Sequence, residues 1–104
     1  MPHYVISYIG GRQPETQEEG QAQFAKWKTW LEDLGPAVIN PGTPLKGSKT
    51  LSGTSVKDTP HLKATTGFSI VDAPDMDAAI KIAQACPFLE MGDLEVGEVQ
   101  QMNM

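Results

Sequence analysis

Alternating apolar residues predict two main β-strands. In segment 3–11, HYVISYIGG, one face carries Tyr4, Ile6 and Tyr8, and the opposite face is also largely apolar. Segment 66–73, TGFSIVDA, alternates in the same way. Because both faces of these strands are apolar, we expect both faces of the sheet to be covered.

Apolar residues at helical spacing predict a long helix from about Thr16 to Leu34. Thr16 and Glu19 have the spacing of a capping box at its start, and Gly35-Pro36 supplies the stop at its end. The expected apolar stripe comprises Phe24, Trp27, Trp30, Leu31 and Leu34.

A second helix is predicted after the acidic turn that follows segment 66–73. Asp75 is a favourable N-cap, and Pro87 ends the helix after Cys86. Asp77 suits the positive end of the helix dipole, so we assign it and Asp75 to helix initiation rather than to chemistry. The expected apolar stripe is Met76, Ala79, Ile80 and Ala83.

The remaining segments predict shorter elements. AVIN (37–40) is a short strand, and the polar segment 41–60 is a loop region with a marginal hairpin around Ser52-Gly53. LEVGEVQQM (94–102) is a closing strand, with a bulge expected near Gly97 because Val99 falls out of phase.

This order of elements predicts a single α+β domain over residues 1–104. Strand, helix, strand, hairpin, strand, helix, strand is a ferredoxin-like plan, with an antiparallel sheet and both helices on one face. The helices leave the second apolar face of the sheet uncovered. The simplest cover is a second copy of the chain, so we expect a homodimer.

Composition excludes several classes of protein. The net charge is −5, with 13 acidic against 8 basic residues, which disfavours nucleic-acid binding. No run of 18 apolar residues is present, so we expect no membrane span. The chain opens Met-Pro-His-Tyr, without the regions of a signal peptide, and has one cysteine, which together favour a cytoplasmic location.

Several segments resemble a known family. They are GFSIVDAPDMDAAIKIAQACP (67–87), KWKTWLEDLG (26–35), KTLSGTSVKD (49–58) and LEVGEVQQM (94–102). Asp58-Thr59-Pro60-His61 stands where that family usually has Asp-Gly-Pro-Phe, keeping two of the four residues. From Tyr4 to Met102 the chain resembles the YCII-related proteins of the DGPF branch.

The resemblance implies a dimeric α+β barrel, in which two ferredoxin-like sheets pack together. Most members have no known activity, and some relatives are enzymes of small-molecule breakdown, for which a His-Asp pair has been suggested as the active site. One branch carries that histidine in the first helix. This chain has Gln23, Lys26 and Lys28 in that region, so the family's chemistry does not transfer whole.

Asp58 and His61 are the candidate catalytic residues. A histidine oriented by a carboxylate is the minimal general acid/base pair, and Pro60 stiffens the turn between them. In the alternative interpretation, Asp58 caps a turn and His61 lies on the surface.

Tyr8, Trp27 and Asp72 are the candidate ligand-binding residues. The two aromatics could line a cleft between the first helix and the sheet, although aromatics at such spacing are more often core. Asp72 ends a strand in phase with Phe68 and Ile70, where it could line a pocket, although aspartates there more often bond turn amides.

Other polar residues give weaker signals. His3, His61 and Cys86 lack the spacing of a metal site, so we expect no metal, and Cys86 should be a small buried apolar group. No glycine-rich phosphate loop is present, and we expect no cofactor. Lysines 46, 49, 57 and 63 could attract an anionic substrate or could be ordinary solvated charges.

Two functional hypotheses remain open. In the first, a small cytoplasmic dimer binds a small organic molecule and catalyses a cofactor-free lyase or isomerase step. In the second, the same dimer is a non-catalytic module that binds a ligand or a protein. A histidine that points into a cavity would favour the first hypothesis.

Overall fold

The computed structural model describes residues 1–100. The elements follow in the order β1 (His3–Ile9), α1 (Gln17–Leu34), η1 (Gly35–Ala37), β2 (Val38–Pro44), β3 (Lys49–Ser52), β4 (Ser55–Asp58), η2 (His61–Lys63), β5 (Thr65–Asp72), α2 (Met76–Gln84), η3 (Pro87–Glu90) and β6 (Asp93–Glu98), where η marks a short 3₁₀ turn.

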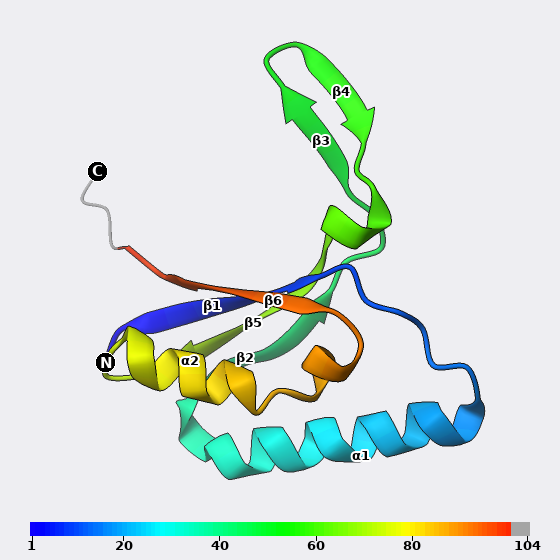
Figure 1. Cartoon of the computed structure of the whole chain (residues 1–104). Coiled ribbons are helices and arrows are strands. Elements are labelled where there is room, and N and C mark those ends of the chain that lie inside the picture. The colour runs from blue at the N-terminus through cyan, green and yellow to red at the C-terminus, as the bar shows by residue number, and fades with distance from the viewer. Residues whose placement is uncertain (101–104) are drawn as a thin grey trace.

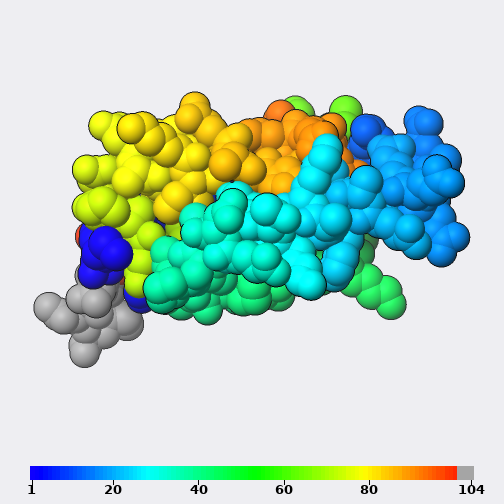
Figure 2. All heavy atoms as spheres, turned by 90° about the horizontal axis from the view of Figure 1, so that it is seen from below, coloured from blue at the N-terminus to red at the C-terminus, as the bar shows by residue number. Residues whose placement is uncertain are grey.

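Four strands form one antiparallel sheet in the order β2-β5-β1-β6. Both helices lie on the same face of this sheet, and β3 and β4 form a separate hairpin that projects from the opposite side (Figure 1). Seen from the helix side, α1 and α2 lie next to each other and cover the sheet (Figure 2). The predicted ferredoxin-like α+β fold is therefore confirmed.

The start of α1 follows the sequence prediction, with one difference. Thr16 is the N-cap, and its hydroxyl accepts from the Glu19 backbone N–H at 3.0 Å. The Glu19 carboxylate does not return to Thr16 as a capping box requires, because it binds the Glu15 N–H and Arg12 instead. Gly35, with φ of 54°, ends α1 as predicted.

The core lies between the helices and the inner face of the sheet. It comprises Tyr4, Ile6, Tyr8, Trp30, Val71, Ala73, Ala79, Ala83 and Cys86. Trp30 donates from its indole N–H to the Ile82 carbonyl oxygen at 3.1 Å, which links α1 to α2. The predicted apolar stripes of the two helices were partly wrong. On α1, Phe24 is 73% exposed. On α2, Met76 and Ile80 are exposed, and Ile82 packs against the core instead.

The outer face of the sheet lies on the side opposite the helices. Val5, Ser7 and Ile9 of β1 alternate with the buried residues of the inner face, and Val5 and Ser7 are paired in register with Ile70 and Phe68 of β5. These side chains are half-buried, whereas the inner-face residues Tyr4, Ile6 and Val71 are fully buried. The structure thus confirms helices on one face of the sheet, and it places apolar side chains of β1 and β5 at the centre of the other face, beside Glu95 of β6.

Two strands differ from their predicted bounds. β2 continues through segment 41–44, which we expected to be loop, because an edge strand tolerates proline and two register shifts absorb its irregular backbone. β6 pairs with β1 without a shift at Gly97, so the bulge expected there was wrong. β6 ends at Glu98, and residues 101–102 of the predicted closing strand lie outside the described residues.

Candidate functional site

An aromatic pocket of about 510 Å³ lies between the N-terminal half of α1 and the strands β1, β2 and β5. Its walls carry four aromatic rings, from Tyr8, Phe24, Trp27 and Phe88. Tyr8 meets Trp27 edge-on, with ring centroids 5.2 Å apart, and lies 5.0 Å from the Phe88 ring. The structure therefore brings Tyr8 and Trp27 together in one cavity between the first helix and the sheet.

Tyr8 belongs both to this pocket and to the core. Its hydroxyl is hydrogen-bonded to the Ser69 hydroxyl, which donates to the Pro41 carbonyl oxygen at 3.1 Å. Burial raises the pKa of Tyr8 above its ordinary value, and this outweighs the lowering effect of the bond to Ser69. The phenol therefore stays protonated at neutral pH and is not a base.

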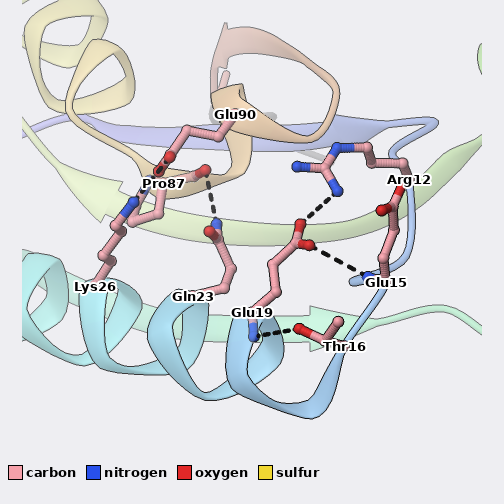
Figure 3. A network of polar contacts seen from close by, with 8 residues as sticks. All are labelled: Arg12, Glu15, Thr16, Glu19, Gln23, Lys26, Pro87 and Glu90. Atoms are coloured by element: carbon pink, nitrogen blue, oxygen red, sulfur yellow. Dashed lines mark hydrogen bonds and ion pairs between the residues drawn. The ribbon is translucent and has the colours of Figure 1, made fainter.

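A polar network holds the N-terminal half of α1 beside the loop after β1 and beside η3 (Figure 3). Gln23 donates to the Pro87 carbonyl oxygen at 2.8 Å, and Lys26 forms a 2.8 Å ion pair with Glu90. Arg12 pairs with Glu19 at 2.5 Å. The contacts of Gln23 and Lys26 tie α1 to η3, which carries Phe88, and the Arg12 pair ties α1 to the loop after β1. Together they help to fix the width of the aromatic pocket.

A second cavity, of about 530 Å³, adjoins the aromatic pocket, and we call it the basic cleft. Arg12, Lys46 and His61 line it. Pro44, Thr66 and Phe88 line both cavities, so the two share a wall. Of the four central lysines considered from the sequence, Lys46 alone lines this cleft.

The position of His61 is set by two glycines that end β1. Gly10 has φ of 65°, and a Cβ there would lie 3.2 Å from the Leu62 backbone, so only glycine lets the loop approach η2 this closely. The His61 ring then reaches the Gly11 carbonyl oxygen, 2.7 Å from Nε2. A carbonyl oxygen only accepts, so Nε2 carries a hydrogen, and in the neutral ring Nδ1 is the atom that can take a proton.

Asp58 has a different partner from His61. It is the residue opposite Lys49 at the base of the β3–β4 hairpin, and the two side chains form an ion pair. The Asp58 side chain is 87% exposed. Within residues 1–100 the side chains of Asp58 and His61 form hydrogen bonds to Lys49 and Gly11 respectively, and not to each other.

Asp72 lies on the outer face of the sheet, away from Tyr8 and Trp27. It pairs in register with His3, and the His3 ring contacts its carboxylate. This His-Asp pair was missed in the sequence analysis, because His3 was considered there only as a possible metal ligand with His61 and Cys86. The sequence did contain a signal for this pair. If β1 and β5 are neighbours in the sheet, the alternation of side chains along each strand places His3 and Asp72 on the same face.

Cys86 lies at the end of α2 beside a groove between the two helices. Burial raises the pKa of the Cys86 thiol to about 11. The thiol is therefore protonated at neutral pH and behaves as the small buried apolar group predicted from the sequence.

Two further observations concern residues 1–100 as a whole. No group of three or more His, Cys, Asp or Glu side chains among them is arranged to hold a metal ion. Neither helix in this range combines the length and apolar character needed to cross a bilayer.

Comparisons with known proteins agree with the fold. The model of the YCII-related domain matches residues 1–103. The chain is similar in structure to 5-chloro-2-hydroxyhydroquinone dehydrochlorinase (TftG) from Burkholderia phenoliruptrix, solved in complex with 2,5-dihydroxybenzoquinone; the TM-score is 0.59 at 20% identity, over 96% of this chain and 95% of the other. No curated protein matches the chain in sequence.

Proposed function

The chain belongs to the YCII-related domain family, and from this premise we propose that it is a small dimeric enzyme that moves a proton on a small organic molecule. The reaction is a lyase or isomerase step without a cofactor. The molecule binds in the aromatic pocket, with Tyr8 and Trp27 in the wall, and His61 is the acid/base group.

One observation carries this proposal: the aromatic pocket and the cleft that contains His61 share the wall formed by Pro44, Thr66 and Phe88. A molecule seated in the pocket therefore has a histidine in the adjoining space. The contact from Nε2 to Gly11 holds the ring and leaves Nδ1 as the proton acceptor. Orientation of a base by a fixed second contact is the usual arrangement in general acid/base catalysis.

The proposed step conserves atoms and electrons. Nδ1 of neutral His61 takes a proton from a carbon beside a carbonyl or hydroxyl group, and the electron pair of the broken C–H bond forms a carbon–carbon double bond. In a lyase step, the displaced electrons leave with an anionic group on the neighbouring carbon. In an isomerase step on an unsaturated ketone, the C=O electron pair first moves onto oxygen to give an enolate. The carbonyl then re-forms, while the far carbon of the conjugated double bond takes the proton back from the imidazolium. Positioned acid/base groups contribute roughly 10²- to 10⁴-fold to such rates.

The structural neighbour supports the same class of chemistry. It is named as a dehydrochlorinase and was solved with a small ring compound. Its fold is shared over nearly the whole of both chains, so a small-molecule site on this scaffold has a precedent.

Asp58 has a lesser part in this proposal than the sequence assigned to it. Its carboxylate pairs with Lys49 and fixes the base of the hairpin that precedes η2. It therefore acts on His61 through the backbone between residues 58 and 61. We treat Asp58 as a positioning residue.

The homodimer forms through the outer face of the sheet in this proposal. Val5, Ile9, Phe68 and Ile70 give that face its apolar character. Two such faces are self-complementary about a two-fold axis, and sheets pack face to face at about 10 Å. The pairing is the dimeric α+β barrel that membership of the family implies.

Replacing Phe68 with aspartate should weaken the dimer at least about tenfold, since burying a phenylalanine side chain is worth roughly 1.5–3 kcal/mol. Size-exclusion chromatography with light scattering, over a series of micromolar concentrations, measures the change. Phe24→Asp on the helix side is the matched control and should leave the dimer intact. A wild-type species of 11.3 kDa at these concentrations would refute the dimer.

Hydrogen exchange tests the proposed catalysis without knowledge of the natural substrate. Wild-type protein is incubated in D₂O with a panel of small cyclic ketones, diones and polyhydroxylated aromatics. Proton NMR then follows the loss of C–H signals. We expect at least one compound to exchange faster than in protein-free buffer. If every compound that binds the pocket exchanges at the uncatalysed rate, the enzyme proposal fails.

The second candidate function is a non-catalytic module that binds a ligand or a protein. The β3–β4 hairpin favours it, because Leu51 and Val56 are exposed there on an element that stands away from the sheet (Figure 1). The exchange experiment separates the two functions: a module binds compounds and leaves their hydrogens unexchanged.

A further inference from the structure

We infer that the ligand is a planar aromatic anion, with its ring in the aromatic pocket and a carboxylate or comparable acidic group in the basic cleft. This inference rests on the proposed function, since it names the class of molecule that the same site takes. The two adjoining cavities differ in lining: aromatic rings surround the aromatic pocket, and cationic side chains line the basic cleft.

The shape of the aromatic pocket selects a flat ring. Tyr8 meets Trp27 edge-on and Phe88 at a tilt. Tyr8 itself is buried, but Trp27 and Phe88 are half-buried, so part of their ring surface can contact a further aromatic partner. A Cβ at Gly67 would lie 3.2 Å from the Tyr8 ring and 3.0 Å from the Thr43 carbonyl oxygen. The Tyr8 ring therefore packs directly against the backbone at Gly67, where no larger residue fits, and this contact holds the ring in the pocket wall.

The charges around the two cavities select an anion. Residues 1–100 include all 13 acidic residues of the chain, and none of them lines either cavity. Two permanently charged side chains, Arg12 and Lys46, line the basic cleft, in a chain whose net charge is −5. A cleft lined by one sign of charge raises the local concentration of a ligand of the opposite sign.

Lys46 is the main source of this selectivity. Glu19 pairs with Arg12 at 2.5 Å and offsets part of its charge. Lys46 has no ion-pair partner among the described residues. Its ammonium group is thus available to an acidic group of the ligand. Lys46 lines the cleft that shares Pro44, Thr66 and Phe88 with the aromatic pocket, so the proposed ligand extends past these residues from the pocket into the cleft.

Three matched probes test both parts of the inference. They are 2-naphthoate, its neutral isostere 2-naphthamide, and the saturated anion decahydro-2-naphthoate. Binding is measured at low ionic strength by NMR titration, following the Trp27 indole N–H and the Thr66 amide. We expect 2-naphthoate to bind at least about tenfold more tightly than either of the others, which corresponds to one favourable charge contact or one ring stack.

Two lysine variants test whether Lys46 supplies the positive charge that binds the acidic group of the ligand. Lys46→Gln should weaken 2-naphthoate binding about 3- to 10-fold and leave 2-naphthamide unchanged. Lys28→Gln is the control, because Lys28 is exposed on α1 and lines neither cavity, and it should change neither affinity. Equal loss for both ligands, or an unchanged affinity for 2-naphthoate, would overturn the role of Lys46.

The remaining outcomes separate this inference from the proposed catalysis. Equal binding of the acid and the amide refutes the preference for an anion, and equal binding of the flat and saturated acids refutes the preference for a planar ring. No binding of 2-naphthoate at millimolar concentration refutes both. If 2-naphthoate binds as expected and no panel compound exchanges hydrogen, the ligand class stands and the catalytic proposal fails. If neutral compounds exchange as well as acids do, catalysis stands and the ligand class fails.

Discussion

Replacing His61 with asparagine is expected to lower the rate of hydrogen exchange into a bound substrate by roughly 10²- to 10⁴-fold, the usual contribution of a positioned general base. The asparagine amide takes the place of Nδ1 but offers no basic nitrogen, and it is too short to replace the contact from Nε2 to the Gly11 carbonyl oxygen. Substrate binding should change little, because the aromatic pocket supplies most of the contact area. The rate is measured by proton NMR in D₂O at saturating compound.

Asp58→Asn tests whether Asp58 takes part in the proton transfer or only positions His61. It removes the charge that pairs with Lys49 at the hairpin base, and its effect on exchange should stay below about tenfold, since exposed ion pairs contribute little. Equal losses in the two variants would instead restore a catalytic Asp58-His61 pair. An unchanged rate in His61→Asn would remove His61 from the mechanism.

Trp30→Ala is expected to reduce the free energy of unfolding by about 3–5 kcal/mol, the usual cost of truncating a buried tryptophan. Trp30 is 5% exposed, packs edge-on against Trp27 at 5.6 Å, and joins α1 to α2 through its bond to the Ile82 carbonyl oxygen. Its removal leaves a cavity between the helices and the sheet. Urea denaturation followed by far-UV circular dichroism measures the change.

Two controls on the same helix separate packing from hydrogen bonding. Trp30→Phe keeps most of the ring and loses the indole donor, so it should cost only about 0.5–1.5 kcal/mol for the bond, plus part of the lost volume. Phe24→Ala truncates an aromatic residue that is 73% exposed and should stay within about 1 kcal/mol of wild type. A large loss in Phe24→Ala would mean that its ring contributes to the core after all.

The fold could be predicted from the sequence because its signals are local. Alternation along segments 3–11 and 66–73, the N-caps Thr16 and Asp75, and the stop at Gly35 act within a few residues, and each appears in the structure. The bounds of β2 could not be read this way. Its second half, Pro-Gly-Thr-Pro, has the composition of a turn, and only pairing with β5 makes it a strand.

The site was harder to predict because its residues meet through tertiary contacts. Nearness in sequence suggested that Asp58 and His61 act together, but the hairpin register turns Asp58 toward Lys49. Phe88 carried no functional signal in the sequence, since its place in the pocket depends on how η3 returns to Gly11 and Tyr8. That Tyr8 and Trp27 line one cavity could be predicted, because each lies on the apolar, inward face of a periodic element, a strand and a helix; their role in ligand binding stays a prediction.

Tyr8 stands in the hydrophobic core and in the wall of the pocket at once. A change of ligand preference in the proposed site is thereby constrained, because a substitution of Tyr8 that reshapes the cavity also removes packing and the hydroxyl contact to Ser69. Variation at the rim, where Phe24 and Thr43 are not fully buried, carries no such penalty. In a laboratory selection for altered specificity, substitutions at the rim should therefore appear first. Substitutions of Tyr8 should appear only in variants that other substitutions have already stabilised.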